Sequence, residues 1–107
     1  MLTQATLHGD ATGRIDLPER FDVMNSARYR IPFVRLLGST ETHSVILNFS
    51  EVTYIDSSGV GTLLAWHKTC QERGKKLVIQ NCGTKVMAIF EMLAIDRILP
   101  IESRMAA

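Results

Sequence analysis

The chain has 107 residues, 12 lysines and arginines against 11 aspartates and glutamates, and a hydrophobic content of 46%. Residues 1–107 fit one small domain, because two halves would each be too short to bury a useful core. The hydrophobic content is ordinary for a globular protein and excludes wholesale disorder. A formal net charge of +1 argues against a nucleic-acid partner, since clustered phosphate contacts usually need a basic surplus.

Cysteine usage and the N-terminal sequence give no sign of export. Two cysteines, Cys70 and Cys82, cannot build a disulfide framework, and no Cys/His spacing predicts a metal site. The first residues lack the basic and then apolar regions of a secretory signal. No apolar run approaches the roughly 18 residues needed to span a bilayer. We therefore expect a cytoplasmic protein with reduced thiols and no direct membrane insertion.

The first half of the chain carries strand and helix signals in alternation. Weak apolar alternation over residues 2–17, interrupted by glycines, predicts two short strands joined by a turn. Apolar residues then recur at helical spacing over 19–37, where Pro32 is expected to kink the helix or displace its start. The apolar run 43–49 is typical of a buried central strand.

The second half continues this order. A helix is predicted over 58–73 and ends at Gly74, a normal stop signal. Residues 77–79 form a second candidate for a buried strand, 84–94 a second amphipathic helix and 98–101 a last short strand. The order β-β-α-β-α-β-α-β predicts an α/β fold, with a mainly parallel or mixed sheet of about four or five strands and helices packed against it.

The turn between the strand ending at Ile55 and the next helix is the most informative segment. It carries Asp56, Ser57 and Ser58, followed by two glycines early in the helix. In open α/β sheets ligands gather at the carboxyl ends of strands, and a helix N-terminus favours an anion. The plain alternative is a capping turn, in which one of these side chains accepts amide hydrogen bonds and the glycines allow close packing.

Catalytic patterns are missing from the sequence. The spacing around Gly59 is neither a Walker A loop nor a nucleophile elbow. The histidines His8, His43 and His67 fall in different predicted elements. His67 shares the core-facing side of its helix, where a structural histidine is expected more often than a base. We therefore predict a protein that is not an enzyme and has no metal or cofactor.

These residues carry a family resemblance. The run 44–64, an apolar strand followed by Asp-Ser-Ser-Gly and then by Gly and Leu-Leu, resembles the central motif of STAS domains, the sulphate transporter and anti-sigma factor antagonist family. The similarity continues through 74–79 and through the later helix with Phe90 and Leu93, and covers about residues 12–101. Pro32 in the first predicted helix departs from the family pattern.

The resemblance implies a bacterial, stand-alone anti-sigma factor antagonist. In that family the unphosphorylated protein binds an anti-sigma factor, which is also a serine kinase, and so frees a sigma factor for transcription. Phosphorylation of a serine ends this binding, and a serine phosphatase of the PP2C type reverses the mark. The position of that serine in the family motif corresponds to Ser57 in this chain, and Ser58 is the second candidate. We call the segment of Asp56, Ser57, Ser58 and Gly59 the switch loop.

The partner surface is expected to surround Ser57. Gly59, Thr62 and Trp66 lie along one edge of the predicted helix after the switch loop, and Met87 flanks the core face of the next helix. A buried aromatic would anchor a partner well. The structural alternatives are that Trp66 packs at the sheet margin and that Met87 belongs to the edge of the core.

The first predicted helix has two apolar stripes. One contains Met24, Ala27, Ile31 and Val34, and the other contains Tyr29, Phe33 and Leu36. One stripe should face the sheet, and the second would be exposed unless it covers the hairpin or binds a partner or a second copy in a homodimer. Replacing Phe33 with Asp distinguishes these roles, because unfolding would identify it as core.

Two other functions compete with the phosphorylation switch. One is a scaffold subunit of a transport or lipid-trafficking complex, in which a STAS-like domain docks in trans to a membrane-associated ATPase without phosphorylation. The other is a small nucleotide-binding protein or enzyme, which the sequence supports less because it has no phosphate-cradling loop with a lysine.

Overall fold

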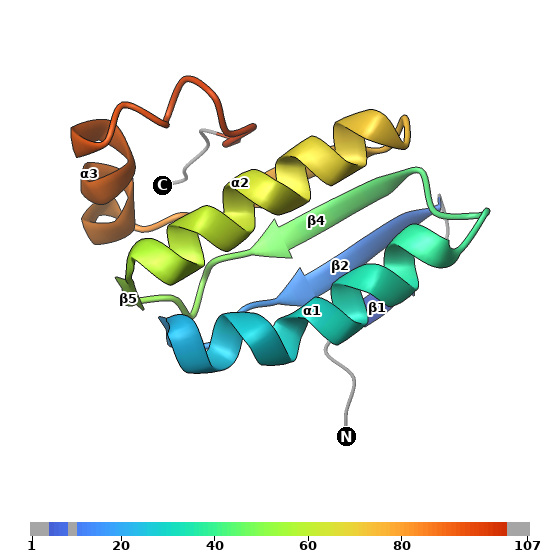
Figure 1. Ribbon diagram of the computed structural model, residues 1–107, viewed down its shortest axis with the longest axis horizontal. Coiled ribbons are helices and arrows are strands. Elements are labelled where there is room, and N and C mark those ends of the chain that lie inside the picture. The colour runs from blue at the N-terminus through green and yellow to red at the C-terminus, as the bar shows by residue number, and fades with distance from the viewer. Residues whose placement is uncertain (1–4, 9–10, 103–107) are drawn as a thin grey trace.

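The computed structural model describes residues 5–8 and 11–102, and its main sheet has four strands. Their order across the sheet is β1-β2-β4-β6, with bounds Ala5–His8, Thr12–Asp16, Ser44–Asn48 and Lys76–Gln80. Figure 1 labels the first three of them. β1 pairs antiparallel with β2, while β2–β4 and β4–β6 are parallel pairs. The predicted α/β class with a mainly parallel, mixed sheet is confirmed, as are both buried strands. The two N-terminal strands are confirmed by β1 and β2, while residues 2–4 and the turn at 9–10 lie outside the described residues.

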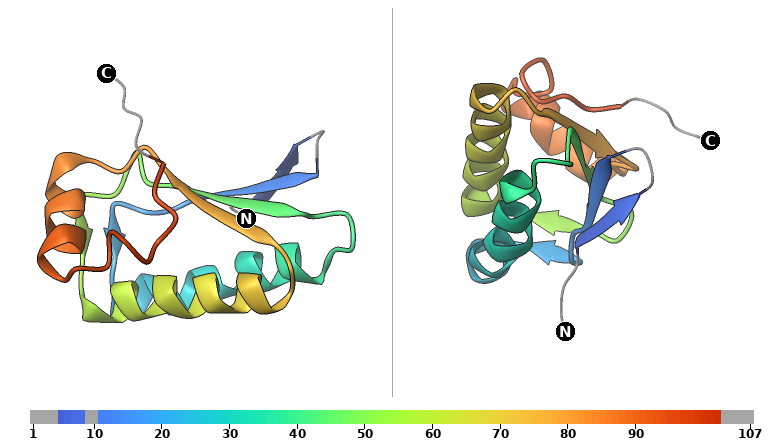
Figure 2. Two further views of the ribbon diagram at one scale, coloured as in Figure 1. Left: turned by 90° about the horizontal axis from the view of Figure 1, so that it is seen from above. Right: turned by 90° about the vertical axis from the view of Figure 1, so that its right-hand side faces the viewer.

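The helices cover one face and one end of this sheet. α1 (Val23–Gly38) and α2 (Ser57–Glu72) lie side by side on one face, and α3 (Thr84–Met92) lies at the end towards which the parallel strands run (Figures 1 and 2). The strands alternate side chains between the two faces, and their inward positions are fully or nearly fully buried. These inward residues are Ile15, Val45, Leu47, Leu77 and Ile79.

The first helix begins four residues later than the sequence analysis expected. The two residues Arg20–Phe21 form β3, which pairs in parallel with β5 (Tyr54–Ile55) in a small second sheet. Phe21 is completely buried, so this segment is held in extended form before the helix starts. α1 then continues through Pro32, which lies inside it rather than at its start.

The two apolar stripes of α1 have different surroundings. Phe33 and Leu36 are buried and Tyr29 packs against the core, so this stripe faces the interior. The other stripe is exposed, with Ile31 at 60% and Val34 at 50% of their full accessible surface. Phe33 is therefore a core residue, and the apolar surface available to a partner is the opposite stripe.

The predicted last strand over 98–101 is wrong. Ile98 and Leu99 both donate their amides to the carbonyl of Ile95, which coils this segment into turns. Only Ile101 reaches the edge of β6, where it forms an isolated parallel bridge with Ile79. The apolar run arose because Leu99 is buried beneath the turns, not because the segment is extended.

A polar network joins the carboxyl ends of the three parallel strands. The Nδ2 of Asn48, on β4, donates to Asp16 Oδ1 on β2 at 2.8 Å. The Oδ1 of Asn48 accepts from Asn81 Nδ2, just after β6, at 2.7 Å. Asn48 is only 5% exposed, and its hydrogen bonds remove the cost of burying its amide. The network fixes the strand ends on which the following loops are built.

Two glycines near the start of α2 have opposite surroundings. A Cβ on Gly59 would lie 2.2 Å from the backbone oxygen of Phe21, whereas a Cβ on Gly61 would meet nothing within 4 Å. The segment before α1 therefore packs directly on the backbone of α2 at Gly59.

Substitution of these glycines tests the contact. Gly59→Ala is expected to lower the free energy of unfolding by about 2 kcal/mol or more, because the backbone at Phe21 must move. Gly61→Ala is expected to raise it by about 0.5–1 kcal/mol, since alanine favours the helix. Urea unfolding of both variants measures these changes. Equal effects of the two substitutions would contradict the packing described.

Candidate functional site

The candidate site is built where β3 and β5 run side by side into α1 and α2. Their register pairs Arg20 with Tyr54 and Phe21 with Ile55, so the next residues, Asp22 and Asp56, occupy equivalent positions. Each aspartate is the N-cap of the helix that follows it. The two helix N-termini therefore lie next to each other at one end of the molecule (Figure 1).

Asp56 connects the two helices. Its Oδ1 accepts the amide of Gly59 at 2.9 Å, which caps α2, and its Oδ2 accepts the amide of Val23, the first residue of α1, at 3.2 Å. A carboxylate is well suited to this position, because each helix presents free N–H groups and the positive end of its dipole there. The capping turn that the sequence analysis gave as an alternative is thus present. Its Asp56 caps α2 and also binds the first amide of α1.

Asp22 caps α1 in the same way. Its Oδ1 accepts the amides of Met24 at 3.2 Å and Asn25 at 3.1 Å. The hydrogen bond from Asn25, with smaller contributions from Met24 and from neighbouring Arg20, lowers the pKa of the Asp22 carboxyl below its ordinary value. Arg20 also places its guanidinium carbon 4.1 Å from the ring centroid of Tyr54. This cation–π contact joins β3 to β5 at the surface.

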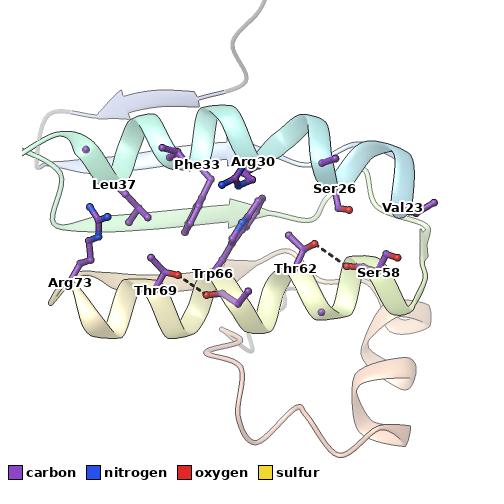
Figure 3. Close-up of a pocket in the computed structure, with 15 residues that line it drawn as sticks. Val23, Ser26, Arg30, Phe33, Leu37, Ser58, Thr62, Trp66, Thr69 and Arg73 are labelled. Carbon is purple, nitrogen blue, oxygen red and sulfur yellow. Dashed lines mark hydrogen bonds between the residues drawn. The ribbon is translucent and has the colours of Figure 1, made fainter.

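The two serines of the switch loop differ in exposure. Ser57 is the exposed first residue of α2. Ser58 is half-buried and lies on the side of α2 that faces α1 (Figure 3). Its carbonyl accepts the hydroxyl of Thr62 at 2.9 Å. The Ser57 hydroxyl is therefore the more accessible of the two to an enzyme in solution.

The predicted partner-binding residues lie deeper than the sequence suggested. Trp66 is 5% exposed and stacks on Phe33, with ring centroids 4.3 Å apart and planes 11° apart. Gly59 is buried against the Phe21 backbone. The Trp66 ring is therefore packed in the interior and exposes little surface of its own, and Gly59 has no free surface to offer. Thr62 and Met87 are half-buried, and Met87 packs against the core.

Three exposed apolar residues belong to the two helix starts near Ser57, where sequence reasoning did not place them. Val23 is 60% exposed, Met24 is 75% exposed and Tyr54 is 41% exposed. The hydrogen bond from Val23 to Asp56 holds the start of α1 beside the switch loop. One signal was available, because Asp22 stands just before helical apolar spacing and is a normal N-cap. The position of Tyr54 depends on its pairing with β3 and has no local signal.

The cysteines and His67 lie outside the capped helix starts. Burial raises the pKa of both Cys70 and Cys82 to about 11, so neither thiol is a ready nucleophile. Within residues 5–8 and 11–102, the Nδ1 of His67 is buried and has no hydrogen-bond partner. Over the same residues there is no group of three or more His, Cys, Asp or Glu side chains that would hold a metal ion.

None of the helices in the described part of the chain combines the length and the apolar character needed to cross a bilayer.

Comparison with known families identifies the chain. Residues 6–107 match the STAS domain family. The matched range contains α1, α2, α3, the capped loop and all of the main sheet except Ala5. The chain belongs to this family, as the Asp-Ser-Ser-Gly segment indicated.

Solved structures show the same fold at low sequence identity. SpoIIAA, an anti-sigma factor antagonist in its unphosphorylated form, is 19% identical with a TM-score of 0.78, covering 95% of this chain and 87% of that one. An anti-sigma-factor antagonist domain protein from Planctomyces limnophilus is 16% identical with a TM-score of 0.79, covering 94% and 89%. The murine anion transporter Solute Carrier 26 family member A9 is 19% identical with a TM-score of 0.69, covering 86% of this chain and 16% of that one.

The lowered pKa of Asp22 predicts a pH-dependent contribution to stability. Because folding favours the carboxylate, the contribution is present above the unfolded value of 3.8 and is lost as the pH falls below it. Asp22→Asn keeps an acceptor for the cap but does not titrate. The variant should therefore lose less stability than the wild type between about pH 6 and about pH 3 in urea unfolding.

Glu41→Gln serves as the control for this experiment. It removes an exposed carboxylate from the turn after α1, away from the capped ends, and should follow the wild type. A loss of stability in Asp22→Asn as large as in the wild type would contradict the role given to the Asp22 carboxylate.

Proposed function

We propose that this STAS domain is an anti-sigma factor antagonist, a binding module that is switched off by phosphorylation of Ser57. The observation that carries the proposal is the exposed position of Ser57 as the first residue of α2, directly after the cap residue Asp56. Membership of the family and the fold shared with SpoIIAA agree with this role.

The fold can accept a phosphate at this position. Phosphorylation adds about −1.5 to −2 charge and three acceptor oxygens. The first-turn amides and the dipole of α2 favour this charge, while the neighbouring Asp56 carboxylate opposes it. The Ser57 side chain is exposed, so the phosphate remains hydrated in the free protein. The modification therefore changes the surface and leaves the core packing in place.

The same charge would disrupt a complex. The apolar side chains of Val23, Met24 and Tyr54 give a partner something to cover around the switch loop. A partner that covers them would also remove water from the phosphate. This desolvation costs several kcal/mol unless the partner supplies matching cations. A penalty of about 3 kcal/mol already weakens binding more than a hundredfold. No conformational change is needed for the switch.

The proposal defines the partners. The anti-sigma factor binds the unphosphorylated protein and, as a serine kinase, modifies Ser57. A serine phosphatase of the PP2C type restores the binding form. Release of the sigma factor then regulates transcription, which places the protein in the cytoplasm. The fold is also shared with SpoIIAA from Bacillus in its phosphorylated form.

The alternative function is a scaffold that is never phosphorylated. It is favoured by the similarity to a domain within the transporter Solute Carrier 26 family member A9. In that case the chain would dock in trans on a transport or lipid-trafficking complex, and Ser57 would serve only at the helix start.

Binding to anti-sigma factor kinases of the source organism tests the proposal. The wild-type protein should bind one of them, and Ser57→Asp should bind that kinase at least about a hundredfold more weakly. With ATP, the kinase should modify wild type and Ser58→Ala but not Ser57→Ala. Isothermal titration calorimetry and intact-mass measurement provide the two readouts.

Thr40→Asp is the matched control, because it adds the same charge to an exposed turn at the far end of α1. It should bind like the wild type. If wild type and Ser57→Asp bind equally, or if no such kinase binds, the switch is refuted and the scaffold function is favoured.

A further inference from the structure

A groove separates α1 and α2 on the face of the molecule away from the sheet. The α1–α2 groove is lined along α1 by residues between Val23 and Gly38 and along α2 by residues between Ser58 and Arg73, and its volume is about 770 Å³ (Figure 3). Each helix has 16 residues, which at about 1.5 Å per residue gives a groove roughly 24 Å long. This surface extends well beyond the switch loop.

The groove has a firm apolar floor and low walls. The stacked rings of Phe33 and Trp66 form the floor. Small residues line much of the walls, including Ala27 on α1 and both Gly61 and Ala65 on α2. Small side chains allow a third helix to approach two others closely, at interaxial distances of about 8–10 Å. The dimensions therefore fit a helix better than a compact ligand.

The charge of the groove has one sign. Arg30 and Arg73 are among its lining residues, which include no aspartate or glutamate, and their side chains lie along the space between the helices (Figure 3). Neither arginine forms an ion pair with a carboxylate in the described part of the chain. α1 itself contains three arginines and no acidic residue. Two unpaired guanidinium groups above an apolar floor complement an anionic, amphipathic partner.

We propose that the α1–α2 groove binds an acidic amphipathic helix of a partner protein. The apolar stripe of that helix would lie on the exposed Ala27, Val34 and Ala65. These residues stand above the floor of Phe33 and Trp66, and the carboxylates of the helix would pair with Arg30 and Arg73. This is the helix-in-groove mode of recognition. The inference does not depend on phosphorylation of Ser57, because the groove is formed by the two helices along their whole length.

The charge argues against the other occupants. A second copy docked through its own exposed α1 stripe would bring Arg28 and Arg35 towards Arg30 and Arg73, and like charges at an interface oppose association. A flat anionic membrane would meet the crest of α1 but would not reach the buried Trp66 in the floor. A protein helix satisfies both the concave shape and the charge.

Fluorescence of Trp66 tests the proposal directly, since it is the sole tryptophan and lies in the groove. The probe is a synthetic peptide as long as α1, fixed as a helix by a hydrocarbon staple, with one Leu/Ala stripe flanked by Glu. A matched peptide has Lys in place of Glu. The acidic peptide should change Trp66 emission in a saturable manner, and the basic peptide should bind at least about tenfold more weakly.

Variants locate the binding. Arg30→Glu, Arg73→Glu and the groove-filling Ala65→Leu should each weaken the acidic peptide about tenfold or more, whereas Arg97→Glu, outside the groove, should change its affinity less than about twofold. The proposal is overturned if neither peptide binds at millimolar concentration or if both bind equally. It is also overturned if Trp66 responds only to protein concentration, which indicates a second copy, or only to phosphatidylglycerol vesicles, which indicates a membrane.

Discussion

The Asp56 carboxylate is the interaction on which the arrangement of this molecule depends. With one oxygen it accepts the amide of Gly59 in α2, and with the other it accepts the amide of Val23 in α1. Two helices that are separated in the chain by β4 and β5 are thereby tied at their N-termini. Beneath this bridge Gly59 packs so closely on the Phe21 backbone that no side chain fits between them.

This joint explains why the switch loop and the start of α1 form one surface. Ser57 follows Asp56 directly and is exposed, while the hydrogen bond from Val23 holds the apolar start of α1 next to it. An exposed hydroxyl beside apolar contact area, supported by a fixed backbone, is the arrangement that the proposed phosphorylation switch requires. The same joint sets the two helices side by side, and their separation creates the α1–α2 groove. The hydrogen bonds of Asp56 therefore position both the surface around Ser57 and the α1–α2 groove.

Much of the fold could be predicted from local signals in the sequence. The buried strands β4 and β6 are apolar runs, and α2 carries both an N-cap at Asp56 and a stop at Gly74, where φ is +69°. A strand ending at Ile55 was expected from the turn that follows it, but β3 and its pairing with β5 could not be predicted, because two residues each are too few to show a period and the pairing is long-range. The segment 98–101 was wrongly predicted as a strand because its apolar residues look like a strand in the sequence. Leu99 is in fact buried within turns.

The candidate site was predictable to a similar degree. Asp56 and Ser57 followed from the motif, and the structure places them at one helix start. Val23 and Tyr54 lay beyond sequence reasoning, because their position beside Ser57 follows from the β3–β5 pairing. Trp66 was assigned equally to core and partner, and its stacking on Phe33 places its ring in the core, where it forms the floor of the α1–α2 groove. Only tertiary packing shows how deeply a single aromatic side chain is buried.

Intact-mass analysis with site mapping, on protein purified from its source organism, tests the central claim most directly. The account predicts a substoichiometric species heavier by about 80 Da, one phosphoryl group, with the modification on Ser57. Protein that is uniformly unmodified, and that stays unmodified after incubation with host lysate and ATP, would contradict it. Modification of Ser58 alone would contradict the assignment of the exposed serine at the start of α2.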